Sequence, residues 1–418
     1  MLIPQLKKQV RYIKMKLEEN QRGSGYSYAK LGVRYPSAGG IVEYLAQSYG
    51  SGYTTGVLSI ILYFSVTIVM AMVARAFGSY AAALVSCQNS VMCVNIFSSA
   101  VVVVLTSINF MGSNIVGKVE KFIVIIKITI LAVFVVAGIW LLNPALLSLK
   151  NGGATPMGAL STVAICLLAY HGFGVITNTV EDMPNPPKTL PKSIYGAIGI
   201  VMIIYVGAAL AVFGNLPLAE IIRAKDYAMA EAAKPIFGQW GFTIVAVTAL
   251  LSAASSINAN LYSTTNMTYL LAKDGELPEF EKRKLWRAGT GGLLLTTVLI
   301  LFIANFLNLT RIASLGSLVY LVVYSAVHLG HLKSLTKETG ASKTIILFAF
   351  LTNFIVFIIF VFQTAEKNPI VIYLLIGFIF ISLLIEVYMQ QVRNRSIQTM
   401  IKTRIKSFRG KTANEIGK

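Results

Sequence analysis

The stretch ICLLAYHGFGVITNTVEDMPNPPKTLPKSI, residues 165–194, contains an apolar run that is broken near its middle. The segment Tyr170-His171-Gly172-Phe173-Gly174 interrupts it, and Glu181-Asp182 followed by four prolines ends it. Glycine costs a helix about 1 kcal/mol relative to alanine, so the pattern indicates unwinding near the middle of a bilayer. Freed backbone groups are tolerated there only where they face protein or a polar cavity. Broken helices of this kind hold the substrate in many secondary transporters, and a glycine-rich face for close helix packing is the alternative.

The composition is that of a membrane protein. Of 418 residues, 56% are apolar and 13% are charged, and the mean hydropathy is +0.70, whereas a soluble protein carries about 25% charged residues. Runs of about 20 apolar residues predict an all-α integral membrane fold, because they are too long and uniform for barrel strands. The ten predicted spans are 53–76, 91–112, 119–142, 157–180, 192–214, 240–270, 289–306, 312–331, 343–363 and 369–388.

The net charge of +19 follows the predicted membrane topology. If both termini are cytoplasmic, cytoplasmic segments hold 28 of the 36 Lys and Arg residues and outer loops hold 6. This asymmetry obeys the positive-inside rule and predicts a multi-pass protein of the cytoplasmic membrane. The basic residues are then expected to contact anionic lipid headgroups, and nucleic acid is not expected as a partner.

The sequence shows no signature of an enzyme. It contains no nucleophile elbow, no phosphate-binding loop and no His/Asp/Glu cluster with metal-ligand spacing, so neither a cofactor nor a metal ion is expected. The three cysteines, Cys87, Cys93 and Cys166, are predicted to be small apolar fillers rather than disulfide or metal ligands. No signal peptide is recognisable in residues 1–25.

Three segments make up the predicted organisation. Residues 1–52 form a basic cytoplasmic segment, in which Leu6, Val10, Ile13 and Leu17 mark an amphipathic helix on the membrane surface. Residues 53–388 form the transmembrane domain, and residues 389–418 form a basic cytoplasmic tail. The Ala-rich run at 228–233 predicts a short surface helix within the outer loop 215–238.

Lys127 stands inside an apolar span, in the stretch FIVIIKITILAV. A lysine at the centre of a span costs roughly 2.5–3.5 kcal/mol on insertion scales and usually faces a partner or a cavity. Such an amine is a candidate for a group that gains and loses a proton. The alternative is snorkelling, because Lys127 lies only about 8 Å from the start of its span.

Other polar residues occur in or near the spans. Ser252, Ser255 and Ser256 fall near one face of span 240–270, where they can offer hydroxyl oxygens to a cation or hydrogen-bond a neighbouring helix. The polar residues expected at or near the membrane surface are Arg75, His328, His331 and Glu386.

Four segments resemble, in order, parts of the amino acid–polyamine–organocation permeases. The stretch quoted above is similar to the sixth-helix signature of that family. The likeness covers about residues 24–395 and is strongest to archaeal proton-coupled, sodium-independent members. The other three segments are YAKLGVRYPSAGG (28–40), VEKFIVIIKITILAVFVVAGI (119–139) and LLSAASSINANLYSTTNMTYLLAKDGELPEF (250–280).

The resemblance implies a LeuT-like fold of five-plus-five inverted repeats that moves amino acids by alternating access. It implies that Lys127 is the proton-coupling amine and that Ser252 and Ser255 are its neighbours. It also implies that carbonyls of the broken helix face the substrate ammonium. The implied substrate-binding residues are Ala169, Tyr170, His171, Gly172, Phe173 and Gly174.

The likeness begins within the second helix of the family, and the ten spans correspond to its helices three to twelve. Half of the implied substrate site is then missing from the sequence, so a truncated, transport-inactive relative is the alternative to a working permease. On this ground the chain as given is expected not to transport amino acids. Two candidates for residues that face the substrate pocket, Tyr63 and Phe173, are aromatic, and no acidic residue lies in the middle of a span. Both features favour small or apolar neutral amino acids as substrates of a working permease.

Overall fold

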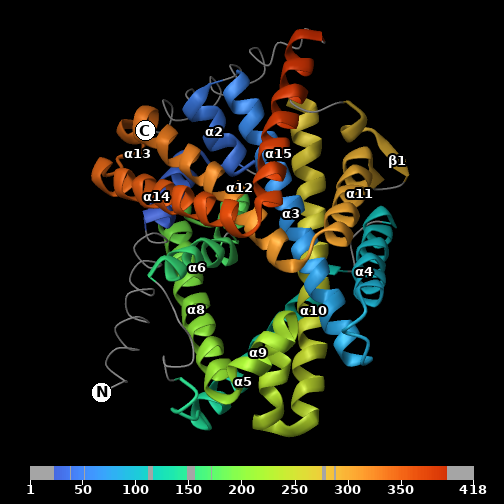
Figure 1. Cartoon of the computed structure of the whole chain (residues 1–418). Helices are drawn as coiled ribbons and strands as arrows, with labels where there is room; N and C mark the ends of the chain where they lie inside the picture. Colours follow the sequence, from blue (N-terminus) through green and yellow to red (C-terminus); the bar gives the residue numbers. More distant parts are fainter. Residues whose placement is uncertain are drawn as a thin grey trace.

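A computed structural model gives the architecture of the chain (Figure 1). It describes residues 23–37, 39–50, 52–111, 116–147, 156–170, 172–274, 279–286 and 289–392. In these ranges the chain is almost entirely helical, and nine helices are long and apolar enough to cross a membrane. The predicted all-α membrane fold is confirmed.

Each predicted span corresponds to an observed helix. The break after Ala169 divides the span predicted at 157–180. The tenth apolar helix is α11, which at 16 residues is shorter than the nine membrane-length spans. The helices are α3 (Tyr53–Leu84), α4 (Val91–Met111), α5 (Val116–Trp140), α6 (Pro156–Ala169), α8 (Pro186–Asn215), α10 (Ala228–Asp274), α11 (Gly291–Phe306), α12 (Leu309–Gly330), α14 (Lys343–Lys367) and α15 (Pro369–Val387).

Helices α3 and α10 pack along each other at the centre of the molecule (Figure 1). The pair α4 and α11 packs on one side of α3, and α12 packs on α3 from another side. Helices α6 and α14 pack against α12 and against each other. Among the long helices, α3 and α12 are the most deeply buried, whereas α5 and α8 expose most of their apolar side chains. A helix that is apolar all round and largely exposed is typical of a lipid-facing position.

The loop before the membrane part of α10 is helical. It contains α9 (Leu218–Ala224), the 3-10 turn η3 (Lys225–Tyr227) and the first turns of α10, which end at Gly238. Gly238 has a φ of 72°, a conformation that glycine adopts without strain. The helix predicted from the Ala-rich run is confirmed, but Ala230, Ala232 and Ala233 are buried in a cluster of apolar side chains rather than exposed at the surface.

Residues 23–49 form two short helices joined by a turn. The first spans 23–34 and the second is α2 (Ile41–Tyr49). Gly40 in the turn has a φ of 50°, and a Cβ atom there would collide with the Asn178 side chain. Glycine is therefore required at this position for both its conformation and its small size. The turn brings the N-terminal segment against the chain that follows the broken helix.

Helices α10 and α11 are joined by η4 (Glu279–Lys282) and a two-stranded antiparallel hairpin of β1 (Lys284–Trp286) and β2 (Gly289–Thr290). Thr290 caps α11 by accepting a hydrogen bond from the Leu293 amide at 3.3 Å. After α12 the chain continues through the π-turn η5 (His331–Leu335) and α13 (Thr336–Thr339).

The prediction for two of the cysteines was wrong. Cys87 and Cys93 form a disulfide between the end of α3 and the start of α4, whereas Cys166 is free. The connecting turn, in which Ser86 has a φ of 59°, brings the two Cα atoms to 6.3 Å. A separation of six residues carries no pattern that would have revealed this pairing.

The predicted amphipathic helix at Leu6–Leu17 and the basic tail from residue 393 onward lie outside the described residues. The predicted domain boundary at residue 53 coincides with the first residue of α3. At the predicted boundary after residue 388, α15 ends at Val387 and the π-turn η6 (Tyr388–Val392) follows.

Candidate functional site

The helix in the opening stretch is interrupted. Helix α6 ends at Ala169, Tyr170 lies in a turn, and α7 (Phe173–Ile176) restarts the helix before η2 (Thr177–Asp182). The Tyr170 amide donates to the Leu167 carbonyl at 3.2 Å, and the Phe173 amide donates to the Tyr170 carbonyl at 3.3 Å. These three-residue steps replace the four-residue steps of an α-helix. The predicted interruption is confirmed, and its role in binding a substrate stays a prediction.

Hydroxyl groups satisfy two carbonyls beside the break. The Tyr205 hydroxyl on α8 donates to the Ala169 carbonyl at 3.3 Å, and the Thr177 hydroxyl donates to the Gly174 carbonyl at 2.6 Å. Such carbonyls are acceptors that can also receive a hydrogen bond from an ammonium group. The break therefore carries hydrogen-bond acceptors within a membrane-length span.

Aromatic rings surround the break on both sides. The Phe173 ring lies 5.4 Å from the Tyr28 ring and 6.1 Å from the Tyr324 ring, measured between centroids. The Tyr170 ring lies 5.4 Å from that of Tyr205. The Tyr28–Phe173 and Tyr170–Tyr205 pairs meet edge to face, a geometry that stabilises a fixed arrangement of rings.

The two glycines of the break differ in the space around them. A Cβ atom added at Gly174 would lie 3.3 Å from Ile41 Cδ1, whereas one at Gly172 would meet nothing within 4 Å. Gly172 has ordinary helical angles (φ −57°, ψ −21°) and is exposed, as is Ala169. Open space therefore adjoins the break at Gly172. His171 lies outside the described residues.

The structure places Lys127 on a peripheral helix. Helix α5 packs against α8 and α10, and its Lys127 side chain is half-buried. Ser252 and Ser255, both half-buried, lie on α10. No hydrogen bond or ion pair from another described residue reaches the Lys127 ammonium. The proton-coupling role of these three residues stays a prediction.

His328 and His331 are not at the membrane surface, contrary to the prediction. Both are fully buried, because helix 23–34 covers the end of α12. Ser24 Oγ lies 3.0 Å from His328 Nε2, and Ser27 Oγ lies 2.8 Å from His331 Nδ1. The sequence alone did not reveal which helix would cover them.

Arg75 and Glu386 are also more enclosed than predicted. Because α3 continues to Leu84, Arg75 is buried, and its guanidinium donates to Asn95 Oδ1 and, at 3.2 Å, to the Ala304 carbonyl. Glu386 is fully buried beside Gly56, where a Cβ atom would collide with its carboxylate. Neither residue is an exposed anchor at the membrane surface.

Outside the spans, Glu281 of η4 is a buried carboxyl group. Burial raises the pKa of Glu281 from 4.5 to about 7, and its Oε2 atom has no hydrogen-bond partner. Isolation from water disfavours the charged form of a carboxyl group. Tyr63, proposed from the sequence to face the substrate, instead hydrogen-bonds Thr296 of α11 at 3.0 Å.

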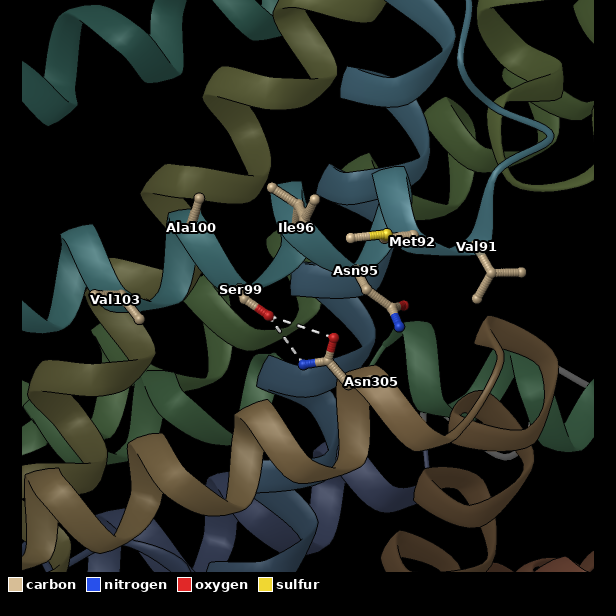
Figure 2. Close-up of a pocket in the computed structure, with 8 residues that line it drawn as sticks. All are labelled: Val91, Met92, Asn95, Ile96, Ser99, Ala100, Val103 and Asn305. Carbon is tan, nitrogen blue, oxygen red and sulfur yellow. Dashed lines mark hydrogen bonds between the residues drawn. The ribbon is translucent and has the colours of Figure 1, made fainter.

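A groove of about 670 Å³ lies along the start of α4 (Figure 2). Figure 2 shows that Ser99 and Asn305 point toward each other across it, with Asn305 Nδ2 2.9 Å from Ser99 Oγ. The Asn95 side chain, which also lines the groove, accepts from Arg75. The Ser99, Asn305 and Asn95 side chains therefore already have hydrogen-bond partners within the protein, and the groove contains none of the predicted site residues.

In the described part of the chain, no group of three or more His, Cys, Asp or Glu side chains could hold a metal ion. Sequence reasoning missed the packing of helix 23–34, and in particular Tyr28, against the break. The one signal was the matched three-residue spacing of Ser24 with Ser27 and of His328 with His331.

Comparison with known proteins finds a matching family and several relatives of the chain. Residues 24–385 match the family described as "Amino acid permease". The chain is 38% identical to the uncharacterized protein MJ0609 of Methanocaldococcus jannaschii, over 89% of this chain and 85% of that one. It is 32% identical to the inner membrane transport protein YbaT of Escherichia coli, over 90% and 86%. It is 26% identical to the serine/threonine exchanger SteT of Bacillus subtilis, over 62% and 58%.

The family match covers most of the chain and includes the broken helix, and the relative from Escherichia coli aligns over nearly the same length. Together with the apolar helices, these matches identify a multi-pass membrane protein that belongs to the amino acid permease family.

Proposed function

We propose that the chain is a proton-coupled amino acid symporter of the cytoplasmic membrane, with both termini in the cytoplasm, rather than the transport-inactive relative that the sequence left as the alternative. The protein alternates between conformations open to either side, and the amino acid binds at the break between Ala169 and Phe173. The observation that carries this proposal is the interruption of a membrane-length helix, with carbonyl groups at the break and open space beside Gly172.

The chemistry of the break favours a neutral substrate. Carbonyl oxygens bind the ammonium group that all amino acids share. The described side chains around them are aromatic or small, and none carries an opposite charge for a basic or acidic side chain: Ala169, Tyr170, Gly172, Phe173, Gly174 and Tyr205. Small and apolar neutral amino acids are therefore the proposed substrates. The serine/threonine exchanger among the relatives is named for neutral substrates of this size.

Lys127 is proposed as the group that binds the coupled proton. It is an amine at membrane depth on a helix that packs against α10, which carries Ser252 and Ser255. A proton taken up by such an amine changes the charge inside the membrane by one unit. That change biases one conformation over the other.

Uptake into liposomes that contain the purified full chain tests this proposal. Radiolabelled alanine, leucine and serine are expected to accumulate when the outside is more acidic than the inside, and a protonophore is expected to abolish the accumulation. Lysine and glutamate are expected to accumulate far less. If folded protein takes up none of these amino acids, the proposal fails and the transport-inactive alternative is supported.

A variant at the open glycine locates the site. Gly172→Leu adds a side chain beside the break without a clash at Cβ, and it is expected to raise the KM for uptake about ten-fold by filling the substrate space. Gly377→Leu is the matched control, because a Cβ atom on α15 at that position also meets nothing within 4 Å. Equal KM values for the two variants would place the substrate elsewhere.

A further inference from the structure

Two histidines that the proposed function does not use lie in the core of the protein. His328 is in the last turn of α12 and His331 begins the π-turn η5, and both are fully buried. π-turns inside helices are frequent at functional sites. The whole chain contains only three histidines.

Each of these histidines pairs with a serine of helix 23–34. Ser24 pairs with His328 and Ser27 pairs with His331, at 3.0 and 2.8 Å. Because both pairs are three residues apart along their segments, helix 23–34 and the end of α12 run in the same direction with these positions in register. Two hydrogen bonds thus fix the N-terminal helix to α12.

The hydrogen bonds of His331 use both ring nitrogens. The Thr339 hydroxyl donates to the Leu335 carbonyl at 2.8 Å, so Thr339 Oγ1 accepts from His331 Nε2 at 2.9 Å. His331 Nδ1 then accepts from the Ser27 hydroxyl. The network therefore assigns one neutral tautomer to His331.

One ring nitrogen of His328 makes no hydrogen bond. Its Nδ1 atom has no partner although the ring is fully buried. A buried N–H without an acceptor is rarer than an unpaired acceptor, so the hydrogen is assigned to Nε2, where Ser24 accepts it. Nδ1 then carries a free lone pair that can take a proton.

Tyr28 connects this nitrogen to the break. Its ring contacts the His328 ring at 6.2 Å and the Phe173 ring at 5.4 Å, between centroids. The Tyr28 hydroxyl is itself buried and without a hydrogen-bond partner. Tyr28 thus contacts both the His328 ring and Phe173, the first residue of α7, and its hydroxyl oxygen is free to accept a hydrogen bond.

The surroundings hold no fixed counter-ion for a charge on His328. In the described part of the chain no ion pair joins either imidazole to a carboxylate. Glu338, next to Thr339, instead accepts from the Tyr35 hydroxyl at 2.7 Å and lies 3.7 Å from Arg34. Glu43 on α2 is a buried carboxylate that accepts a hydrogen bond from Gln47 at 2.8 Å. The other titratable groups on these segments are Tyr26, Tyr28 and Lys30 on helix 23–34, Tyr44 and Tyr49 on α2, Tyr320 and Tyr324 on α12, and the exposed Lys333 on η5. Helix α14 offers the amide of Asn353.

We propose that His328 Nδ1 takes up a second proton in each transport cycle, in addition to the one proposed for Lys127, and that Tyr28 passes this change to the break at Phe173. The inference rests on the proposed function. A proton from water adds to the lone pair of Nδ1, and the new N–H recruits the Tyr28 hydroxyl as its acceptor, which moves the ring against Phe173. The proton leaves by cleavage of the same N–H bond, and no other bond changes.

The coupling is tested by the gradient stimulation of uptake. This quantity is the uptake with an inward proton gradient divided by the uptake without one. His328→Gln removes the titrating ring but retains an amide for Ser24. Tyr28→Phe removes only the proposed acceptor. Each is expected to lower the stimulation about ten-fold, a size typical of coupling between two sites. Tyr49→Phe, which removes a hydroxyl that donates to the Ala326 carbonyl at 2.6 Å, is the matched control and is expected to retain it.

Nitrogen NMR of histidine-labelled protein in detergent reads the proton directly. With three histidines in the chain, His328→Gln assigns the His328 signals. Nδ1 is expected to gain its proton as the pH falls, at a pH that shifts when alanine is added. One unchanged protonation state of His328, or full gradient stimulation in both variants, would overturn the inference. A wild type that takes up no amino acid counts against the proposed function instead, and the NMR titration still decides the proton site.

Discussion

The carboxyl group of Glu281 makes the stability of the fold depend on pH. The residue is 2% exposed, and burial raises its pKa from 4.5 to about 7. The folded protein thus holds this proton more tightly than the unfolded chain does. The resulting stabilisation is fully present below pH 4.5 and is lost as the pH rises through about 7. A shift of this size corresponds to roughly 3 kcal/mol.

Glu281→Gln is therefore expected to remove this pH dependence of the free energy of unfolding. The wild type should lose about 2–3 kcal/mol of unfolding free energy between about pH 5 and pH 8 through this group, whereas the variant should lose much less because an amide does not titrate. Thermal unfolding in detergent across this range measures the difference. Glu366→Gln, at an exposed carboxyl group of α14, is the control and should follow the wild type. Parallel curves for wild type and Glu281→Gln would contradict the expectation.

Single polar residues were the least predictable part of the chain. Lys127 and the glycines of the break stood out because each is costly inside an apolar span. His328 and Arg75 were assigned to the surface because they lie near span ends, yet helix 23–34 and the extension of α3 bury them. Burial near the end of a helix depends on what packs there, and a single sequence contains little information about that.

At the scale of helices, small residues let α5 and α8 approach closely. A Cβ atom added at Gly207 would lie 2.5 Å from Val135 Cγ1, and one at Gly138 would lie 2.5 Å from Ala211 Cβ. Small residues at such contacts are the usual means by which membrane helices pack tightly. This contact positions α5, and with it Lys127, against the rest of the protein.

Gly207→Leu is expected to force these two helices apart and to lower the unfolding free energy by about 1–3 kcal/mol, the usual cost of overpacking. Gly199→Leu on the same helix is the matched control, because a Cβ atom there meets nothing within 4 Å. The control should stay within about 0.5 kcal/mol of the wild type. Thermal unfolding in detergent compares them, and an equal loss in both variants would argue against the α5–α8 contact.

The positions of the helices were predictable because span length and apolar composition follow directly from the thickness of a bilayer. Span 91–112 became α4 (Val91–Met111), and span 369–388 became α15 (Pro369–Val387). The interruption after Ala169 was also predictable, since glycines inside an apolar run are a local signal. The contacts of Tyr28 with Phe173 and His328 join segments about 145 and 300 residues apart, and no local pattern encodes such contacts.

At the scale of the whole molecule, the disulfide provides a test of membrane orientation. Cys87 and Cys93 join the ends of α3 and α4 at a turn that the charge pattern assigns to the outer face. Disulfides persist mainly on the oxidising side of a membrane, so the bond agrees with termini in the cytoplasm. The turn between α13 and α14, which contains the exposed Ser342, should then face inward.

Labelling of intact cells with a bulky, impermeant maleimide checks this orientation in a Cys166→Ser background. Cys87 and Cys93 should react only after treatment with an impermeant reductant, and they should do so without opening the cells, because their disulfide faces outward. A thiol introduced by Ser342→Cys, with Cys87 and Cys93 replaced by serine, should react only after the membrane is permeabilised. The reverse pattern would invert the topology and place both termini outside, against the distribution of Lys and Arg on which the orientation rests.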